Sequence, residues 1–500
     1  MTYFRFEILK IALFLALPFF EIVACEISAE KGEFDKNELL KNISSNLDDT
    51  LLSKSFEFII SNITYHNSEG LLFADSNGKR IELQIDTFGS IDTFKKFISE
   101  NGYSVSSKIM ADSTLLSNSF LKDDIYLAYQ SWQSFPWSKK AGFELFKNYL
   151  LPYKILDEAP GKWRIFFLKK YRELLDSMAK VPGVTSYNVY DRIINQEIAK
   201  WFHYKKDYFA FTQSPSFEEL MCIKEGECTR IAYIYTYALR SAGLPATVDF
   251  VPFWGSQNGG HAEVIFMDST GRMVTYEKYR LGRSAKVFRK TFTRHMESLE
   301  SSTYLKSQND TYLTFLLSDH YLDVTNEHNL VSDIPFTLPD SIRAPIAYIC
   351  IFNYGQWQPV FWSRVDKNNK IVFQNMGRDI LYKIAVPKNS DIQFIGYEFL
   401  LDSSGKIRYK QPELRKLQQL KLHKINHGSE SWVRKGNIYS LYYLNSKNEW
   451  QLNKTKPCLQ DSVITFERVP VNSFYRLVKT GGDKRLERCF LYNNGVQCWY

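Results

Sequence analysis

The sequence predicts an α+β protein in which helices come first, a helix and sheet follow, and strands dominate the carboxyl-terminal part. Residues 111–215 repeat apolar side chains at spacings of three and four, as in 142–151, where Pro152 ends the pattern. From about residue 320 short alternating runs appear, such as 346–352 and 370–373, which are typical of antiparallel strands. Both periodicities occur in one chain, so the class is neither all-α nor all-β.

These patterns divide the chain into five segments, whereas length alone, at about 150 residues per domain, suggests roughly three domains. The basic run 406–424 is interpreted as a solvated helix or linker face, and Asn493-Asn494-Gly495 as a hairpin turn. The expected segments are a leader at 1–24, an α/β region at 25–110, a helix-plus-sheet domain at 111–310, a β-sandwich-like domain at 320–425, and a β-rich end at 430–500.

Composition excludes several function classes. Lys and Arg number 63 and Asp and Glu 55, and a net charge of +8 over 500 residues is too dilute for a nucleic-acid-binding face. Hydrophobic residues at 44% exclude a disordered chain. Seven cysteines without a CxxC spacing argue against a disulfide scaffold and a zinc ribbon. We therefore expect no metal, no cofactor and no nucleic-acid partner.

The amino terminus has the pattern of an export signal. Arg5 and Lys10 lie at the start of a ten-residue apolar run, 11–20, which is too short to span a bilayer. The next residues, Ile-Val-Ala-Cys at 22–25, resemble the lipobox of bacterial lipoproteins, which implies cleavage before Cys25 and a lipid on that residue. We expect an exported protein, anchored by lipid to a bacterial outer membrane or cell surface. The alternative is an ordinary secretory signal.

One cysteine stands at a predicted helix start. Cys228 follows Gly226-Glu227, and Gly243 and Pro245 end the helix. The positive end of a helix dipole favours a thiolate, which is the reactive form. Because Cys228 is turned into the domain, we expect no disulfide with nearby Cys222. Apolar residues follow it at helical spacing: Ile231, Ile234, Tyr235, Ala238 and Ala242.

A histidine begins one of the strands that follow. Residues 246–253, 261–267 and 272–279 are predicted strands, and His261 stands behind a Gly-Gly loop. A base on the sheet can then face a nucleophile on the helix, as cysteine-dependent acyl transfer requires. Trp254 and Gln257, in the preceding loop, could contact substrate or could simply pack.

Residues 216–280 resemble the core of the transglutaminase-like superfamily. Three motifs carry this resemblance: Gly226-x-Cys228, the segment 238–246 and Gly260-His261-Ala262. The resemblance implies a papain/transglutaminase-like core at 111–310, with a helix bearing the cysteine packed on an antiparallel sheet and a Cys–His–acid triad. The wider chain resembles bacterial lipoproteins that contain this domain. This sequence departs from the family pattern in two ways. Glu263 stands where tryptophan is usual, and the acidic member of the triad is not in the family's usual Trp-x-x-x-Asp context.

Two acids follow the histidine. Asp268 lies roughly 23 Å along an extended chain, in a turn-forming Asp-Ser-Thr-Gly run. If the chain folds back near 269–270, opposed residue numbers sum to about 539, which brings Glu277 within one step of His261. The family's acid also lies on the strand after the histidine strand. We expect Cys228 to be the nucleophile, His261 the general base and acid, and Glu277 the residue that orients the imidazole.

The predicted function is a secreted, lipid-anchored cysteine hydrolase or acyltransferase that acts on amide or peptide bonds through a thioester. Its expected partners are a protein, peptide or glycan-linked amide substrate and, through Cys25, a membrane. The thioester can react with water, which gives hydrolysis, or with an amine, which gives cross-linking. The backbone N–H of Cys228 is expected to donate one hydrogen bond to the oxyanion. The alternative is a catalytically inactive surface lipoprotein that binds a protein or carbohydrate through aromatic platforms, with Trp357, Trp362 and Trp432 as candidates.

Overall fold

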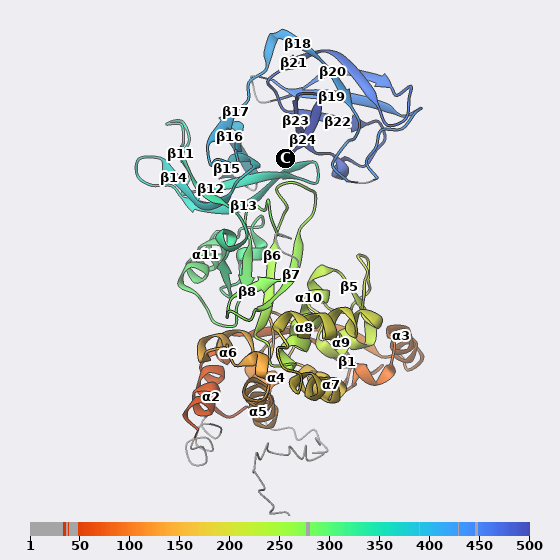
Figure 1. Cartoon of the computed structure of the whole chain (residues 1–500), viewed down its shortest axis with the longest axis vertical. Helices are drawn as coiled ribbons and strands as arrows, with labels where there is room; N and C mark the ends of the chain where they lie inside the picture. Colours follow the sequence, from red (N-terminus) through yellow and green to blue (C-terminus); the bar gives the residue numbers. More distant parts are fainter. Residues whose placement is uncertain are drawn as a thin grey trace, which may run out of the picture.

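The computed structural model describes residues 34–36, 39 and 49–500, except 277–280, 390, 429 and 446–448. The predictions for the leader and for Cys25 lie outside these residues. The molecule is elongated: helices gather at one end, a mixed helix-and-sheet region follows, and strands form the other end (Figure 1). The mixed α+β class is therefore as expected. No helix among the described residues has the length and apolar composition needed to cross a bilayer.

The first described elements are a helix and a small sheet. The helix α2 (Thr50–Asn62) begins at Asp49, whose carboxylate accepts the backbone N–H groups of Leu51 and Leu52. The antiparallel sheet has the order β2-β1-β3, and α3 lies between its second and third strands in the chain. Their bounds are β1 (Asn67–Ala74), β2 (Arg80–Ile81), α3 (Ile91–Glu100) and β3 (Ser104–Ala111).

Residues 112–223 are largely helical, as the apolar spacing predicts. The helix α6 ends at Tyr149, before Pro152, and its Phe146 shares a hydrophobic core with Phe56 and Ile59 of α2. This core joins the amino-terminal segment to the next one. The helices are α4 (Asp112–Leu115), α5 (Asn118–Ser134), α6 (Phe143–Tyr149), α7 (Trp163–Ala179), α8 (Ser186–Tyr190) and α9 (Phe217–Ile223).

The centre of the molecule is the helix α10 (Cys228–Ser241) packed on a five-stranded antiparallel sheet of order β10-β9-β6-β7-β8. Tyr233, Ile234 and Ala238 of α10 share a core with Val248 and Val264 of the sheet. The last strand of this sheet lies beyond residue 310. The strands are β6 (Ala246–Val251), β7 (His261–Met267), β8 (Met273–Thr275), β9 (Phe288–Lys290) and β10 (Tyr321–Asp323).

Burial along α10 is wider than the single apolar face that the sequence predicts. Almost every residue from Ala232 to Ser241 is buried, Arg240 included, because α7 packs against α10 in addition to the sheet. The guanidinium of Arg240 donates to the carbonyl oxygens of Tyr149, Pro152, Lys154 and Ala246. These hydrogen bonds to backbone carbonyl oxygens allow the charged side chain of Arg240 to be buried on an otherwise apolar face of α10.

Short elements connect this centre to its neighbours. The two-residue strands β4 (His203–Tyr204) and β5 (Glu225–Gly226) pair in parallel just before α10. The helix α11 (Met296–Ser307) lies between β9 and β10 in the chain, and α12 (Thr325–His328) follows β10.

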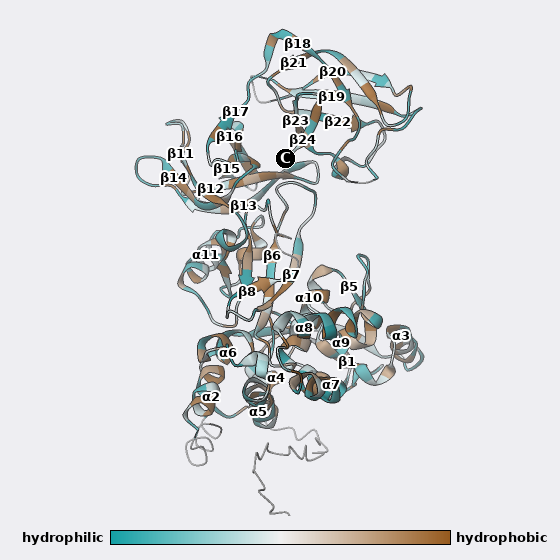
Figure 2. Ribbon diagram, in the orientation of Figure 1, coloured by the Kyte–Doolittle hydropathy of each residue, from teal (hydrophilic) through white to brown (hydrophobic). Residues whose placement is uncertain are grey.

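The carboxyl-terminal part consists of antiparallel strands, as the alternating runs predict. Its first sheet, β13-β12-β15-β16-β17, lies beside the pair β11-β14, and β12 is largely apolar in Figure 2. The strands are β11 (Val331–Thr337), β12 (Ile346–Asn353), β13 (Gln356–Arg364), β14 (Lys370–Gly377), β15 (Ile380–Lys388), β16 (Asp391–Leu401) and β17 (Ile407–Tyr409).

A second sheet, β20-β19-β22-β23-β24, and the pair β18-β21 complete the chain. Asn493 pairs with Val496, and Asn494 and Gly495 both have positive φ, so the predicted hairpin turn is confirmed. The basic run 406–424 is not a helix or linker: it forms β17 and β18. The strands are β18 (Glu413–Leu422), β19 (Ile438–Leu444), β20 (Trp450–Pro457), β21 (Ile464–Val471), β22 (Tyr475–Lys479), β23 (Cys489–Asn493) and β24 (Val496–Trp499).

Candidate active site

Cys228 is the first residue of α10, where the sequence places it. Glu227 caps the helix, since its carboxylate accepts the backbone N–H of Arg230 at 3.0 Å. Glycine is required at 226 because a Cβ there would lie 2.5 Å from the Cβ of Arg230. The short strand β5 and this cap therefore fix the point at which the helix begins, and with it the position of the thiol.

The Cys228 thiol is not predisposed to ionise, contrary to the expectation from the helix start. Burial raises its pKa above the ordinary value, although the backbone N–H of Ala262 partly offsets this by donating to the sulfur. Desolvation of the thiolate thus outweighs the helix end. A thiol of this kind needs a base to take its proton. Cys228 and Cys222 form no disulfide with each other, as predicted; both are free thiols, and Cys222 is buried in a separate apolar cluster with Phe94.

His261 is the first residue of β7 and pairs with Val251 of β6. Glycine at 260 permits this because a Cβ there would lie 2.4 Å from the carbonyl oxygen of Pro252. The imidazole stacks on the Trp254 ring, with 6.0 Å between centroids, and its Nε2 lies 3.8 Å from a carboxylate oxygen of Glu263. Trp254 therefore packs against the candidate base.

The loop 252–260, which ends at His261, is held by the carboxyl-terminal sheets. The Asn353 amide on β12 donates to the carbonyl oxygens of Trp254, Gln257 and Gly259, each at 3.1 Å. The buried Arg488 guanidinium donates to the carbonyl oxygen of Gly255 at 2.6 Å. Local sequence patterns do not predict these contacts, because the partners lie about 100 and more than 200 residues away. The β-rich end thus positions the histidine loop.

Cys228 and His261 line one cavity of about 750 Å³. Ala262 joins them, since its N–H reaches the thiol and it follows His261 directly in β7. Two buried histidines that the sequence analysis did not select form part of the wall. The rings of His66 and His320 stack at 4.3 Å and donate to the same Phe292 carbonyl oxygen, at 2.9 and 3.0 Å. Burial lowers the pKa of both imidazoles, so these two rings are neutral at pH 7.

The structure describes only one of the two acids that follow His261 in the sequence, Asp268 and Glu277. Asp268 forms the predicted turn: its Oδ1 accepts the backbone N–H groups of Thr270 and Arg272 at 2.8 and 3.0 Å. Strands β7 and β8 pair so that residue numbers sum to 540, close to the expected register. Glu277 lies outside the described residues, two positions beyond the end of β8.

Glu263 is a carboxylate near the imidazole that the sequence analysis did not assign to the triad. It lies two residues after His261 on the same strand, so both side chains share one face of the sheet, as the spacing could have indicated. Across the strand pair it faces Asp249. Burial opposes ionisation of Asp249, but the Arg289 guanidinium and the His328 imidazole outweigh it and hold its pKa below the ordinary value.

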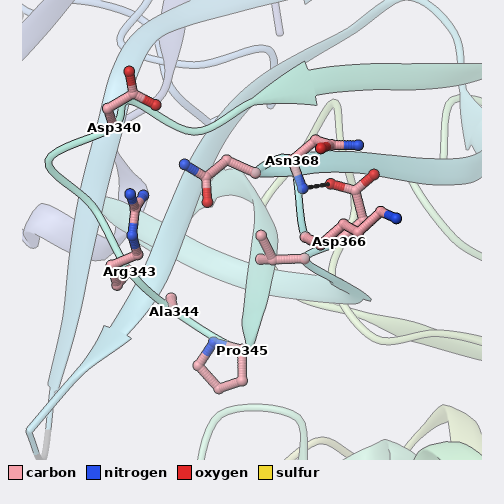
Figure 3. Close-up of a pocket in the computed structure, with 9 residues that line it drawn as sticks. Asp340, Arg343, Ala344, Pro345, Asp366 and Asn368 are labelled. Carbon is pink, nitrogen blue, oxygen red and sulfur yellow. Dashed lines mark hydrogen bonds between the residues drawn. The ribbon is translucent and has the colours of Figure 1, made fainter.

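A second hollow, of about 630 Å³, lies on the loops around 340–345 and 365–369 (Figure 3). Its Asp366 carboxylate accepts the backbone N–H groups of Asn368 and Lys370, at 2.8 and 2.7 Å. This acid therefore stabilises a turn. Among the described residues, no group of three or more His, Cys, Asp and Glu side chains could hold a metal ion.

The aromatic residues considered as carbohydrate platforms differ in exposure. Trp362 is buried, stacks on Tyr304 at 5.0 Å between ring centroids, and donates its indole N–H to Ser301 at 2.8 Å. It belongs to the core and offers no face to a sugar. Trp357 is partly buried and packs edge-on against Phe352. Trp432 is 39% exposed, with the Lys424 ammonium 4.6 Å from its ring centroid.

No protein-family model matches the chain, and no curated protein matches it. Among solved structures, the chain is similar to red sea bream transglutaminase, with 8% sequence identity and a TM-score of 0.21. The match covers 88% of this chain and 78% of the transglutaminase chain. At this level the similarity is only a weak one of fold. The function must therefore be inferred from the residues of the site.

Proposed function

We propose that the chain is a transglutaminase-like cysteine hydrolase or acyltransferase that acts on amide or peptide bonds through a thioester on Cys228. One observation carries this proposal: a thiol at the first position of α10 and an imidazole at the first position of β7 line the same cavity. The thiol also accepts a hydrogen bond from Ala262, the residue after that histidine. A nucleophile and a base held by different elements around one cavity are what covalent acyl transfer requires.

The reaction begins with proton transfer from the Cys228 thiol to His261, which is needed because burial raises the pKa of the thiol. The thiolate then attacks the amide carbonyl carbon. The backbone N–H of Cys228, at a helix end where N–H groups lack intrahelical acceptors, stabilises the oxyanion. His261 returns the proton to the leaving amine, and a thioester remains. Water then gives hydrolysis, and an amine gives cross-linking.

The function is tested by incubating the purified chain with a panel of peptide and amide substrates, wild type beside Cys228→Ala, and by following amine release and amine incorporation. Release alone identifies a hydrolase, whereas incorporation of a primary amine identifies an acyltransferase. Turnover that persists in Cys228→Ala would place the chemistry elsewhere.

The acid that orients His261 is proposed to be Glu277. We expect Glu277→Gln to reduce turnover by roughly 10²-fold or more, because a neutral amide no longer stabilises the imidazolium. Asp268→Asn should leave turnover nearly unchanged, since this side chain serves a turn. Glu263→Gln is the decisive comparison, because its carboxylate lies 3.8 Å from Nε2. If Glu263→Gln causes the larger loss, with melting temperature unchanged, the orienting role belongs to Glu263.

We also propose that the protein is exported and anchored through lipid on Cys25. Metabolic labelling with a fatty-acid probe should mark the wild type and not Cys25→Ala, and only the wild type should sediment with membranes. Equal labelling of both chains, or labelling of neither, would contradict the anchor.

A further inference from the structure

Four lysines are buried among the described residues, and they differ in their partners. Three of them have a carboxylate against the ammonium: Lys154 with Asp112 at 2.7 Å, Lys383 with Glu398 at 2.7 Å, and Lys286 with Asp323. The fourth, Lys290, is 9% exposed and has no carboxylate within 4.0 Å among the described residues. Its Nζ instead donates to the Tyr233 hydroxyl at 3.0 Å.

The unpaired lysine is the buried one that lines the cavity of Cys228. It is the last residue of β9, and its head contacts Tyr233 of α10, the helix that carries the nucleophile. The Nζ also lies 5.3 Å from the ring centroid of Tyr233 and 5.5 Å from that of Phe250. These aromatic contacts help to hold the cation. Burial keeps Tyr233 neutral by raising its pKa well above the ordinary value, so this phenol does not balance the charge.

Of the acids whose charges act on Lys290, two have other hydrogen-bond partners and the third is exposed. Glu158 accepts the Leu156 N–H at 2.9 Å and the Tyr237 hydroxyl at 2.8 Å, and Glu227 caps α10. Asp157 lines the cavity but is exposed to solvent. A buried cation without an ion-pair partner is unfavourable by itself, and an anion in the cavity would relieve that cost.

We propose that the cavity takes an acyl donor that carries a carboxylate near the scissile amide, and that Lys290 binds this carboxylate. The inference rests on the proposed function, because it names the substrate class of the same site. Lys290 is then the residue that sets specificity for an acidic over a neutral substrate, through a charge-assisted hydrogen bond. Burial lowers the pKa of Lys290 to about 8, so the ammonium form still predominates at pH 7.

Two alkylating reagents of similar size and different charge test the proposal. Iodoacetate carries a carboxylate and iodoacetamide a neutral amide, and in both reactions the thiolate sulfur displaces iodide. The rate of each at Cys228 is measured by peptide mass spectrometry and corrected with glutathione as the reference thiol. Because both reagents react with the same thiolate, their rate ratio is independent of the pKa of Cys228. The ratio therefore measures the preference of the cavity for a carboxylate over a neutral amide.

We expect Lys290→Met to lower the iodoacetate/iodoacetamide ratio at Cys228 roughly tenfold, the size of one charge-assisted hydrogen bond. Lys306→Met is the matched control, because Lys306 lines the same cavity but is exposed, and it should change the ratio less than twofold. An unchanged ratio in Lys290→Met, or an equal fall in both variants, would overturn the proposal.

A second test uses the wild type alone and measures how the iodoacetate/iodoacetamide rate ratio depends on pH. As pH rises from 7 to 9.5, Lys290 loses its proton and the ratio should fall with a midpoint near its pKa of about 8. The charged groups that face it are Asp157, Glu158, Arg230 and Glu227. A flat ratio over this range would also overturn the proposal. Failure of the proposed function has a different signature: iodoacetamide would modify Cys228 no faster than the half-buried Cys498.

Discussion

Cys228→Ala is expected to abolish amide cleavage, with a loss of about 10³-fold or more, while leaving the fold intact. The loss of rate is this large because no thioester can form without the sulfur, so that only substrate binding and contacts to the oxyanion remain. The melting temperature should hardly change, since alanine at the first position of α10 keeps the Glu227 cap and removes only one half-buried atom. An electrophilic probe should label the wild type at Cys228, and the variant should lose the label at this position.

Cys222→Ala is the matched control, because Cys222 lies six residues away and is 2% exposed. Burial raises the pKa of its thiol to about 11, so it should neither react with the probe nor affect turnover. Probe labelling of Cys228 should rise with pH, because the pKa of this thiol is also raised and the thiolate forms only as protons are removed. Full activity in Cys228→Ala, or equal labelling of both cysteines, would contradict the assignment.

The largest stability effect is expected at the buried pair Lys154–Asp112. Both side chains are inaccessible, with the ammonium 2.7 Å from the carboxylate. The same carboxylate accepts the hydroxyls of Tyr153 at 2.6 Å and Ser68 at 2.5 Å, so it joins α4, β1 and the segment before α7. Lys154→Met leaves the Asp112 charge without its ion pair. We expect a loss of about 3–5 kcal/mol in the free energy of unfolding.

Urea unfolding measures this loss, and two further variants interpret it. Lys96→Ala removes an exposed ion pair with Glu100, at 3.7 Å, and should change stability by less than about 1 kcal/mol. The double variant Asp112→Leu with Lys154→Met should recover part of the loss, because it leaves no buried charge. If Lys154→Met is as stable as Lys96→Ala, the buried pair does not hold these segments together.

Local sequence determined the elements that carry the site. The start of α10 at Cys228 and the bounds of β7, from His261 to Met267, agree with expectation because caps, glycines and apolar periodicity act over a few residues. The Asp268 turn and the Asn494-Gly495 hairpin follow for the same reason. The prediction of a helix or linker at 406–424 is wrong, because lysines and arginines indicate a solvated surface but not whether a helix or a strand carries them.

Other properties of the site depend on residues that are distant in the sequence. The thiol pKa is raised because the fold buries Cys228, which a helix-end argument does not include. Trp362 is a core residue because Tyr304 covers its ring, and the histidine loop is fixed by Asn353 and Arg488 from other sheets. Lys290 differs from the other buried lysines only in what surrounds it. Burial and pairing arise from contacts between segments far apart in the chain, and local patterns carry no information about them.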